Sequence, residues 1–202
     1  MNNEHTIQLR AAVPEDAASL LDIYAPYVAD TAISFEYSVP SLAEFTQRIQ
    51  NVLKRFPYLV AEKKSSREIL GYVYASPFHP REAYKWAVET SIYIRQGYTG
   101  LGLGRRLYEA LERILKEQHI ITLYACIAAP PGPDEFVSDR SILFHQHMGY
   151  DLIAEFDRCA YKFGRWYNMV WMEKNILPHA DIPKTPLTFD EVRSHTDVMA
   201  ML

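Results

Sequence analysis

Hydrophobic and polar positions alternate with two different periods along the chain, and the periods separate strands from helices. A period of two predicts a first strand over Thr6–Ala11. Residues 13–30 predict a helix, because Pro14 suits a first helical turn and an apolar face follows at helical spacing. A second helix is expected after Ser41, with Glu44 placed three residues later as in a capping box.

Three strand-like segments follow one another at residues 58–63, 68–78 and 84–94. They are rich in β-branched and aromatic residues and are separated by short connections. Because short connections join antiparallel neighbours, we expect an antiparallel meander.

A strand–helix–strand unit comes next. Leucines at 103, 107, 111 and 115 recur every four residues and predict an amphipathic helix, and the apolar run at 120–128 predicts a buried strand. This order favours a parallel strand pair. Cys126 falls in the apolar run, so we expect its thiol to serve packing and not catalysis.

The last part of the chain combines short elements with proline-rich connections. A loop at 129–137 precedes a short helix within 138–150 that stops at Gly149, and two strands at 151–163 and 165–174 flank a turn at Gly164. Residues 176–202 hold three prolines and little periodicity. We therefore expect one domain over residues 1–175 and an extended tail over 176–202, which wraps the domain or a partner or is partly disordered.

Composition narrows the class of protein. Of 202 residues, 49% are hydrophobic and 23% charged, which is typical of a soluble globular protein. The net charge of -4 disfavours nucleic acid as a partner. The two cysteines form no CxxC pair, and the sequence shows neither a signal peptide nor a membrane span. We expect a cytoplasmic protein with reduced thiols and no membrane contact.

The stretch YTGLGLGRRLYEAL, residues 98–111, places glycines at alternate positions where a helix begins. It fits neither the Walker A loop, which needs a Gly-Lys pair, nor the dinucleotide fingerprint, which needs glycine where Arg105 or Leu107 stands. Free amides and the helix dipole favour an anion at such a turn. Arg105 and Arg106 are explained either by an anionic ligand or as solvated charges on an exposed face.

At this turn the chain resembles the GCN5-related N-acetyltransferase (GNAT) superfamily, whose phosphate loop is [Q/R]-x-x-G-x-[G/A]. Thr99-Gly100-Leu101-Gly102-Leu103-Gly104 matches it, with Thr99 where Arg or Gln is usual. The segments DIYAPYV, ISFEYSVPS, GYVYASPFHPREAYKWAVETSIYI, FHQHMGY and YKFGRWYNMVWMEK extend the likeness over residues 6–174. They are similar to the phosphinothricin and methionine sulfoximine acetyltransferase group.

The resemblance implies an α/β (α+β) fold with a mixed, mostly antiparallel seven-stranded sheet and about four helices. Its fourth and fifth strands splay apart and admit acetyl-CoA. The resemblance further implies that backbone groups pair with the acetyl and pantetheine amides at Ser91, Ile92, Tyr93 and Ile94. The pyrophosphate would be held by the residues of the glycine turn, which are Thr99, Gly100, Leu101, Gly102, Leu103, Gly104 and Arg105. The N-x-x-S motif of the group falls at Ser138 and Ser141.

Acetyl transfer to an amine needs a base for the amine, a donor for the oxyanion and a proton for the leaving thiolate. Glu89 is the candidate base, since it is the only carboxylate of its strand and matches a glutamate of the group. The alternative is a structural carboxylate that pairs with Arg81 or Lys85. A backbone amide near Ile92 or Tyr93 is the simplest oxyanion donor.

The resemblance makes His145 the candidate acid. The alternative is a structural helix histidine bonded to a carbonyl. His145 and His147 are two residues apart and point to different sides of a helix, so we expect no metal site.

Phe35, Arg81, Tyr84 and Trp86 fall on segments that border the acceptor side in the group, where Arg81 would pair with a substrate carboxylate. The alternative for the aromatic residues is core or dimer packing, and Lys162, Arg165 and Trp166 would lie near the site or the dimer contact. The sequence therefore predicts an acetyl-CoA-dependent N-acetyltransferase for the primary amine of a small molecule, such as phosphinothricin or methionine sulfoximine, acting as a homodimer. The alternatives are a protein or peptide amine acetyltransferase and a non-catalytic acyl-CoA sensor.

Overall fold

The computed structural model describes residues 6–197, which fold around one seven-stranded sheet in the order β1-β2-β3-β4-β5-β7-β6. The strands are β1 (Ile7–Ala11), β2 (Tyr58–Lys63), β3 (Ile69–Pro77), β4 (Ala87–Ile94), β5 (Thr122–Ala129), β6 (Asp151–Lys162) and β7 (Arg165–Asn175). All neighbours are antiparallel except β4 and β5, which are parallel. The predicted mixed, mostly antiparallel sheet is confirmed, including the β2–β3–β4 meander and the parallel pair.

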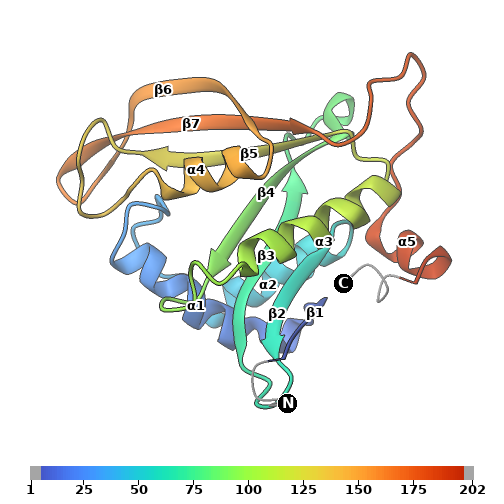
Figure 1. Cartoon of the computed structure of the whole chain (residues 1–202), viewed down its shortest axis with the longest axis horizontal. Helices are drawn as coiled ribbons and strands as arrows, with labels where there is room; N and C mark the ends of the chain where they lie inside the picture. The colour runs from blue at the N-terminus through green and yellow to red at the C-terminus, as the bar shows by residue number, and fades with distance from the viewer. Residues whose placement is uncertain (1–5, 198–202) are drawn as a thin grey trace.

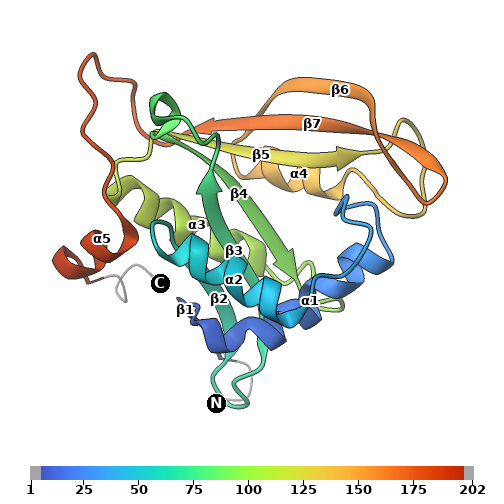
Figure 2. The same ribbon diagram turned by 180° about the vertical axis from the view of Figure 1, so that it is seen from behind.

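Helices cover both faces of the sheet. Helices α1 (Ala17–Ala29) and α2 (Leu42–Leu53) lie on one face and α3 (Leu103–Glu117) on the other, while α4 (Arg140–His147) lies beside β5 (Figures 1 and 2). A fifth helix, α5 (Phe189–His195), contacts α3. Short 3-10 turns occupy Pro14–Asp16 and Glu82–Tyr84. No helix of the described residues is long and apolar enough to cross a membrane.

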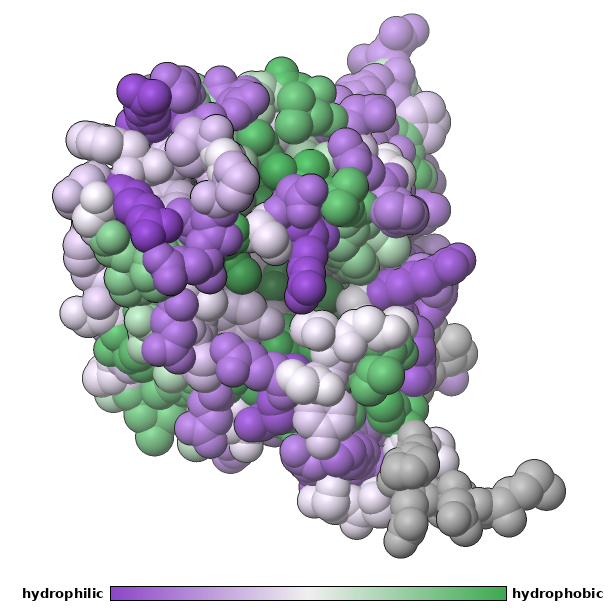
Figure 3. Space-filling model, turned by 60° about the vertical axis from the view of Figure 1, so that its left-hand side comes forward, coloured by the Kyte–Doolittle hydropathy of each residue, from purple (hydrophilic) through white to green (hydrophobic). Residues whose placement is uncertain are grey.

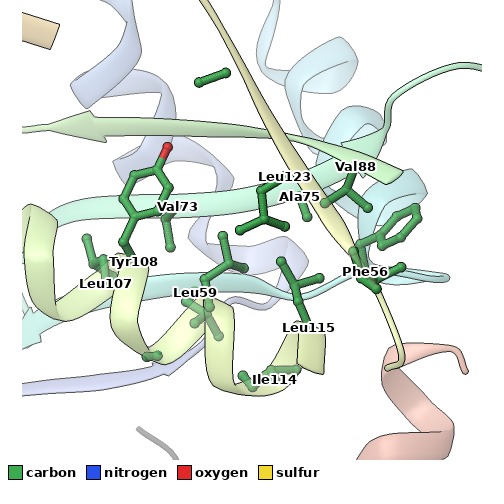
Figure 4. Close-up of a cluster of buried hydrophobic side chains, with 14 of the residues drawn as sticks. Phe56, Leu59, Val73, Ala75, Val88, Leu107, Tyr108, Ile114, Leu115 and Leu123 are labelled. Carbon is green, nitrogen blue, oxygen red and sulfur yellow. The ribbon is translucent and has the colours of Figure 1, made fainter. Parts of the chain in front are cut away.

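The core has two halves because alternate residues of the central strands point to opposite faces. On one face, the leucine stripe of α3 is fully buried against Leu59 and Val73, as Figure 4 shows. On the other face, Val60 and Tyr72 pack with the apolar sides of α1 and α2. Strands β2 and β3 are thus buried on both faces, and β4 pairs with β3 along its length.

The predicted cap of α2 is formed only in part. The Ser41 side chain accepts a hydrogen bond from the amide of Glu44 at 3.2 Å. The Glu44 carboxylate turns away from the helix start and pairs with Arg48, one turn later. The reciprocal half of the expected capping box is therefore replaced by an i, i+4 ion pair.

The sheet opens between its two parallel strands. β4 and β5 pair at only three positions, Ala87–Thr122, Val88–Leu123 and Glu89–Tyr124. β4 then stays with β3 as far as Ile94, and β5 stays with β7 as far as Ala129. Figure 1 shows the two strands meeting on one side and diverging toward the other. The predicted splay is confirmed.

The segment after β7 packs on the domain and ends in a helix that the sequence analysis missed. The amide of Leu187 donates to the carbonyl of Gln118 at 3.0 Å, and the amide of Phe189 donates to that of Arg55 at 2.9 Å. Thr188 and Glu191 form a complete capping box at the start of α5, and the Phe189 side chain is fully buried in the core. The end of this segment, from Leu187 through α5, therefore lies against its own domain, and residues 198–202 lie outside the described part.

Replacing Phe189 tests whether this segment contributes to the core. Because Phe189→Ala leaves a cavity under α3, we expect it to lower the free energy of unfolding by about 3–5 kcal/mol in urea denaturation. Ile182 of the same segment is 91% exposed, so Ile182→Ala is the matched control and should change little. Equal stability of the two variants would show that the segment is not docked.

Candidate active site

The open end of the strand pair forms a cleft with a cavity of about 60 Å³. Residues of both diverging strands, of the α1–α2 loop and of the α4 region line it: Ile33, Thr90, Ser91, Ile92, Tyr93, Ala125, Cys126, Ile127, Ala128, Val137, Ser141 and His145. Figure 3 shows the side of the molecule toward which the strands diverge, with hydrophobic surface in a hollow between hydrophilic side chains. The cleft thus joins apolar walls to a few polar groups, as ligand sites do.

The cleft brings together some of the predicted cofactor residues but not all of them. Ser91, Ile92, Tyr93 and Ser141 line the cavity. Ile94 lies beyond it, and its carbonyl accepts a hydrogen bond from the Tyr27 hydroxyl at 2.5 Å. Ser138 is exposed at the start of α4 and does not line the cavity.

A side chain also crosses between β4 and β5 at the point where their backbone ladder ends. The Thr90 hydroxyl donates to the carbonyl of Tyr124 at 3.1 Å. The hydroxyls of Tyr108 and Tyr150 lie 3.2 and 3.3 Å from the same Thr90 oxygen. Thr90 is 4% exposed, so this hydroxyl cluster closes the inner end of the cleft.

The glycine turn before α3 is built to leave its amides uncovered. Gly100 and Gly102 have φ values of 79° and 76°, and a Cβ atom at either position would meet no atom within 4 Å. No side chain caps the start of α3. Unpaired amides at a helix N-terminus with open space above them fit a pyrophosphate. Gly104 serves packing, since a Cβ there would come within 3.1 Å of the Phe144 ring.

Both arginines that follow this turn have protein partners. Arg105 is largely exposed and pairs with Glu109 at 2.7 Å, and Arg106 donates to the carbonyl of Ile7 at 3.1 Å. The contacts favour the view that these are solvated surface charges. The backbone amides of the turn are then the groups that fit the anion.

Glu89 occupies the last paired position before β4 and β5 part. It is half-buried, and burial raises the pKa of its carboxyl above the ordinary value of 4.5. Among the described residues no ion pair joins it to Arg81 or Lys85. These contacts do not support the structural alternative, and they leave the carboxylate available to a ligand.

Cys126 corrects one prediction. The neighbouring Ala125 and Ile127 point into the core beneath α3, so Cys126 faces the other side of the sheet and is exposed at the cleft. Partial removal of the Cys126 thiol from solvent raises its pKa to about 12, and the negative charge of Glu89 raises it further. The thiol is therefore protonated at neutral pH.

His145 is 3% exposed and both of its ring nitrogens are engaged. Nδ1 lies 2.7 Å from the carbonyl of Ser141, and Nε2 lies 2.8 Å from the Tyr108 hydroxyl. Because a carbonyl only accepts, Nδ1 carries the proton, and in a neutral ring Nε2 accepts from Tyr108. Burial lowers the pKa of His145 to about 4, so the ring is neutral at pH 7. The geometry favours the carbonyl-bonded structural histidine over the proton donor.

The four predicted acceptor residues do not lie together. The Phe35 ring lies 6.4 Å from that of Tyr167, in a cluster with Val137 at the cleft. Arg81 and Tyr84 line a separate hollow. Trp86 donates its indole N–H to the carbonyl of Lys184 at 2.7 Å. Of the four, Phe35 belongs to the surroundings of the cleft.

Sequence reasoning missed Thr90, Ile33 and Val137 as cleft residues. Thr90 directly follows the candidate base, so its position on the strand was a usable signal. Ile33 and Val137 lie in irregular loops, where no periodicity reports which way a side chain points.

A parallel strand pair that splays open, followed by a helix whose first amides are bare, fits a long ligand with an anionic end. Residues 9–171 match the family model described as the acetyltransferase (GNAT) domain, and the chain belongs to this family. It is an acetyl-CoA-dependent N-acetyltransferase, and acetyl-CoA is its cofactor.

Relatives and solved structures agree with this assignment. The chain is 32% identical to a phosphinothricin N-acetyltransferase of Streptomyces coelicolor, over 83% of this chain and 95% of the relative. It is 28% identical to an L-methionine sulfoximine/L-methionine sulfone acetyltransferase of Pseudomonas paraeruginosa, over 87% and 98% of the two chains. The crystal structure of a phosphinothricin acetyltransferase from Sinorhizobium meliloti in complex with AcCoA has a TM-score of 0.78, at 27% identity over 91% and 98%.

One further structure matches with a different described activity. The ribosomal-protein-alanine N-acetyltransferase of Brucella melitensis has a TM-score of 0.73 and 29% identity, over 83% of this chain and 99% of that one. Identity near 30% to both groups establishes the family and leaves the acceptor to be argued from the site.

The state of His145 makes a testable prediction about stability and pH. Its pKa is about 4 in the folded protein, against about 6.5 in an unfolded chain. The neutral ring therefore stabilises the fold fully above pH 6.5, and this contribution, up to about 3 kcal/mol, is lost as the pH falls toward 4. We expect urea unfolding at several pH values to show that the free energy of unfolding falls less steeply with decreasing pH in His145→Gln than in the wild type.

His147 provides the matched control, because it is exposed on the same helix. In His147→Gln, the free energy of unfolding should change with pH as it does in the wild type. If His145→Gln kept the wild-type pH dependence, the pKa of His145 would be the same in the folded and unfolded chains, and this result would restore His145 as a candidate acid.

Proposed function

We propose that the enzyme transfers the acetyl group of acetyl-CoA directly to the primary amine of a small molecule, such as an amino-acid analogue of the phosphinothricin or methionine sulfoximine type. The observation that carries the proposal is the place of Glu89, a half-buried carboxylate at the point where the cofactor strands part. The names of the relatives support this substrate class.

Glu89 acts as the general base in this proposal, directly or through one water. A carboxyl whose pKa is raised by burial is a stronger base than an exposed one, and no cation competes for it among the described residues. The amine loses its proton toward Glu89 and attacks the thioester carbonyl. A backbone amide of β4 near Ile92 or Tyr93 stabilises the oxyanion, since both residues line the cavity.

The leaving thiolate needs little help. A thiol of ordinary pKa near 8.5 is a good leaving group at neutral pH, so a dedicated acid contributes little to the barrier. His145 in this proposal is a neutral residue that holds Tyr108 and the Ser141 carbonyl in place at the cleft wall.

The second candidate is a protein or peptide amine, which the Brucella melitensis structure favours. The structure of the acceptor side speaks against it. The amide of Ala32 donates to the carbonyl of Phe136 at 3.0 Å, and the Tyr37 hydroxyl donates to the carbonyl of Tyr161. Because the loops beside the cleft are tied together, they border a short hollow and not a long groove for a peptide.

The substitution Glu89→Gln tests the base. With phosphinothricin or methionine sulfoximine as the amine, release of free thiol from acetyl-CoA should fall about 10²–10⁴-fold in kcat/KM. The raised pKa of Glu89 should place the acidic limb of the wild-type pH profile above 4.5, because activity is lost as the carboxyl is protonated, and the variant should lack that limb.

Glu117 is exposed at the end of α3, and Glu117→Gln is the control that should retain full activity. Full activity of Glu89→Gln would remove Glu89 as the base. A panel that also contains an alanine-starting peptide decides the acceptor, since acetylation of the peptide alone would replace the small-molecule proposal.

We further propose that the enzyme is a homodimer that uses β6. This last strand of the sheet exposes about half of the side chains of Leu152, Ile153 and Phe156. Apolar side chains gathered on an edge strand are typical of an association surface. Light scattering should give twice the mass of one chain, and Ile153→Glu should halve it. Ile182→Glu changes an exposed residue of the last segment and should leave the mass unchanged. A monomeric wild type would overturn the proposal.

A further inference from the structure

A single buried lysine joins two parts of the chain that are far apart in the sequence. Lys162 ends β6, is 3% exposed, and donates from Nζ to three backbone carbonyls. They belong to Val28 at 2.7 Å, Thr31 at 2.8 Å and Ser34 at 2.7 Å. An ammonium group has three donors, so every donor of this buried cation is used.

The three carbonyls lie at the C-terminal end of α1 and in the loop after it, where a positive charge is favourable. Val28 belongs to the last turn of α1, whose final carbonyls have no partners within the helix and carry the negative end of its dipole. Thr31 and Ser34 belong to the loop of residues 30–41 that leads to α2. Burial lowers the pKa of Lys162, and the nearby negative charge of Glu36 opposes that effect.

The loop of residues 30–41 forms part of the cleft. Ile33 lines the cavity between β4 and β5, and Phe35 packs on Tyr167 of β7. The glycine turn that fits the pyrophosphate lies at the start of α3, and none of its residues lines this cavity. A shift of the loop would therefore change the acceptor side of the cleft and leave the phosphate end as it is.

We propose that Lys162 is a positioning residue, which holds the 30–41 loop at the height over the cleft that the amine acceptor requires. The proposal rests on the proposed transfer to a small amine. Lys162 does not touch the reacting atoms and acts through Ile33 and Phe35. The β6–β7 turn thereby sets the shape of the acceptor site from outside it.

The substitution Lys162→Met keeps the apolar stem and removes the ammonium group. We expect the KM of the amine acceptor to rise about 10-fold or more, with the KM of acetyl-CoA within about two-fold of the wild type. Lys116 is exposed on α3, and Lys116→Met makes the same change of charge and should alter neither KM. An unchanged acceptor KM, or an equal rise in both constants, would overturn the proposal.

Hydrogen exchange provides a readout independent of activity. In Lys162→Met, amides of residues 30–41 should exchange about 10-fold faster or more, while amides of β2 keep their rates. A uniform increase over both regions would show a general loss of stability and would overturn the local role. If the wild type acetylates no amine, the proposed function fails, yet the exchange result still decides whether Lys162 holds the loop.

A second variant covers the case in which Lys162→Met does not fold. The Tyr37 side chain is 72% exposed, and its hydroxyl ties the same loop to the carbonyl of Tyr161. Tyr37→Phe should raise the acceptor KM and the exchange of the loop in the same direction, by a smaller factor. Wild-type values for both quantities would overturn the coupling between the β6–β7 turn and the acceptor side.

Discussion

The hydrogen-bonded ladder between β4 and β5 stops after Glu89 and Tyr124, and the site depends on that stop. An open sheet edge normally leaves unpaired backbone groups, which are costly when buried. Here the Thr90 hydroxyl takes the Tyr124 carbonyl, and the hydroxyls of Tyr108 and Tyr150 gather on it. These hydroxyl contacts fasten the two strands together at the inner end of the cleft, and the candidate base Glu89 occupies the last paired position beside it.

The two sides of the cleft are held by different means. The proposed cofactor side is built from backbone: diverging strand edges and the bare amides at the start of α3. The proposed acceptor side is held by contacts between residues far apart in the sequence, above all those of the Lys162 ammonium group with three carbonyls at the end of α1 and in the loop after it. Because the two sets share few residues, acceptor preference can change through the loops while the cofactor end keeps its form. This separation is consistent with relatives of one fold that carry different acceptor names.

Features encoded by neighbouring residues could be predicted from the sequence, including the meander, the parallel pair and the open glycine turn before α3. Features set by distant contacts could not. The side to which Cys126 points follows from the core beneath α3, and Arg81 and Tyr84 turn out to line another hollow than the cleft. Helix α5 was missed for another reason. Thr188 and Glu191 form a capping box that is visible in the sequence, but the prolines before it favoured an extended tail. The three hydrogen bonds that the Lys162 ammonium group donates have no local signature in the sequence.

Burial acts in opposite senses on the two predicted catalytic groups. Desolvation penalises whichever form is charged, so it raises the pKa of Glu89 and lowers that of His145. For a base, a raised pKa is useful, because the carboxylate binds a proton more strongly. For an acid that must be an imidazolium, a pKa near 4 leaves almost no proton to give at neutral pH. The same low-dielectric surroundings therefore support the proposed general base and argue against the histidine acid, so the proposed chemistry rests on Glu89 and on the leaving ability of the thiolate.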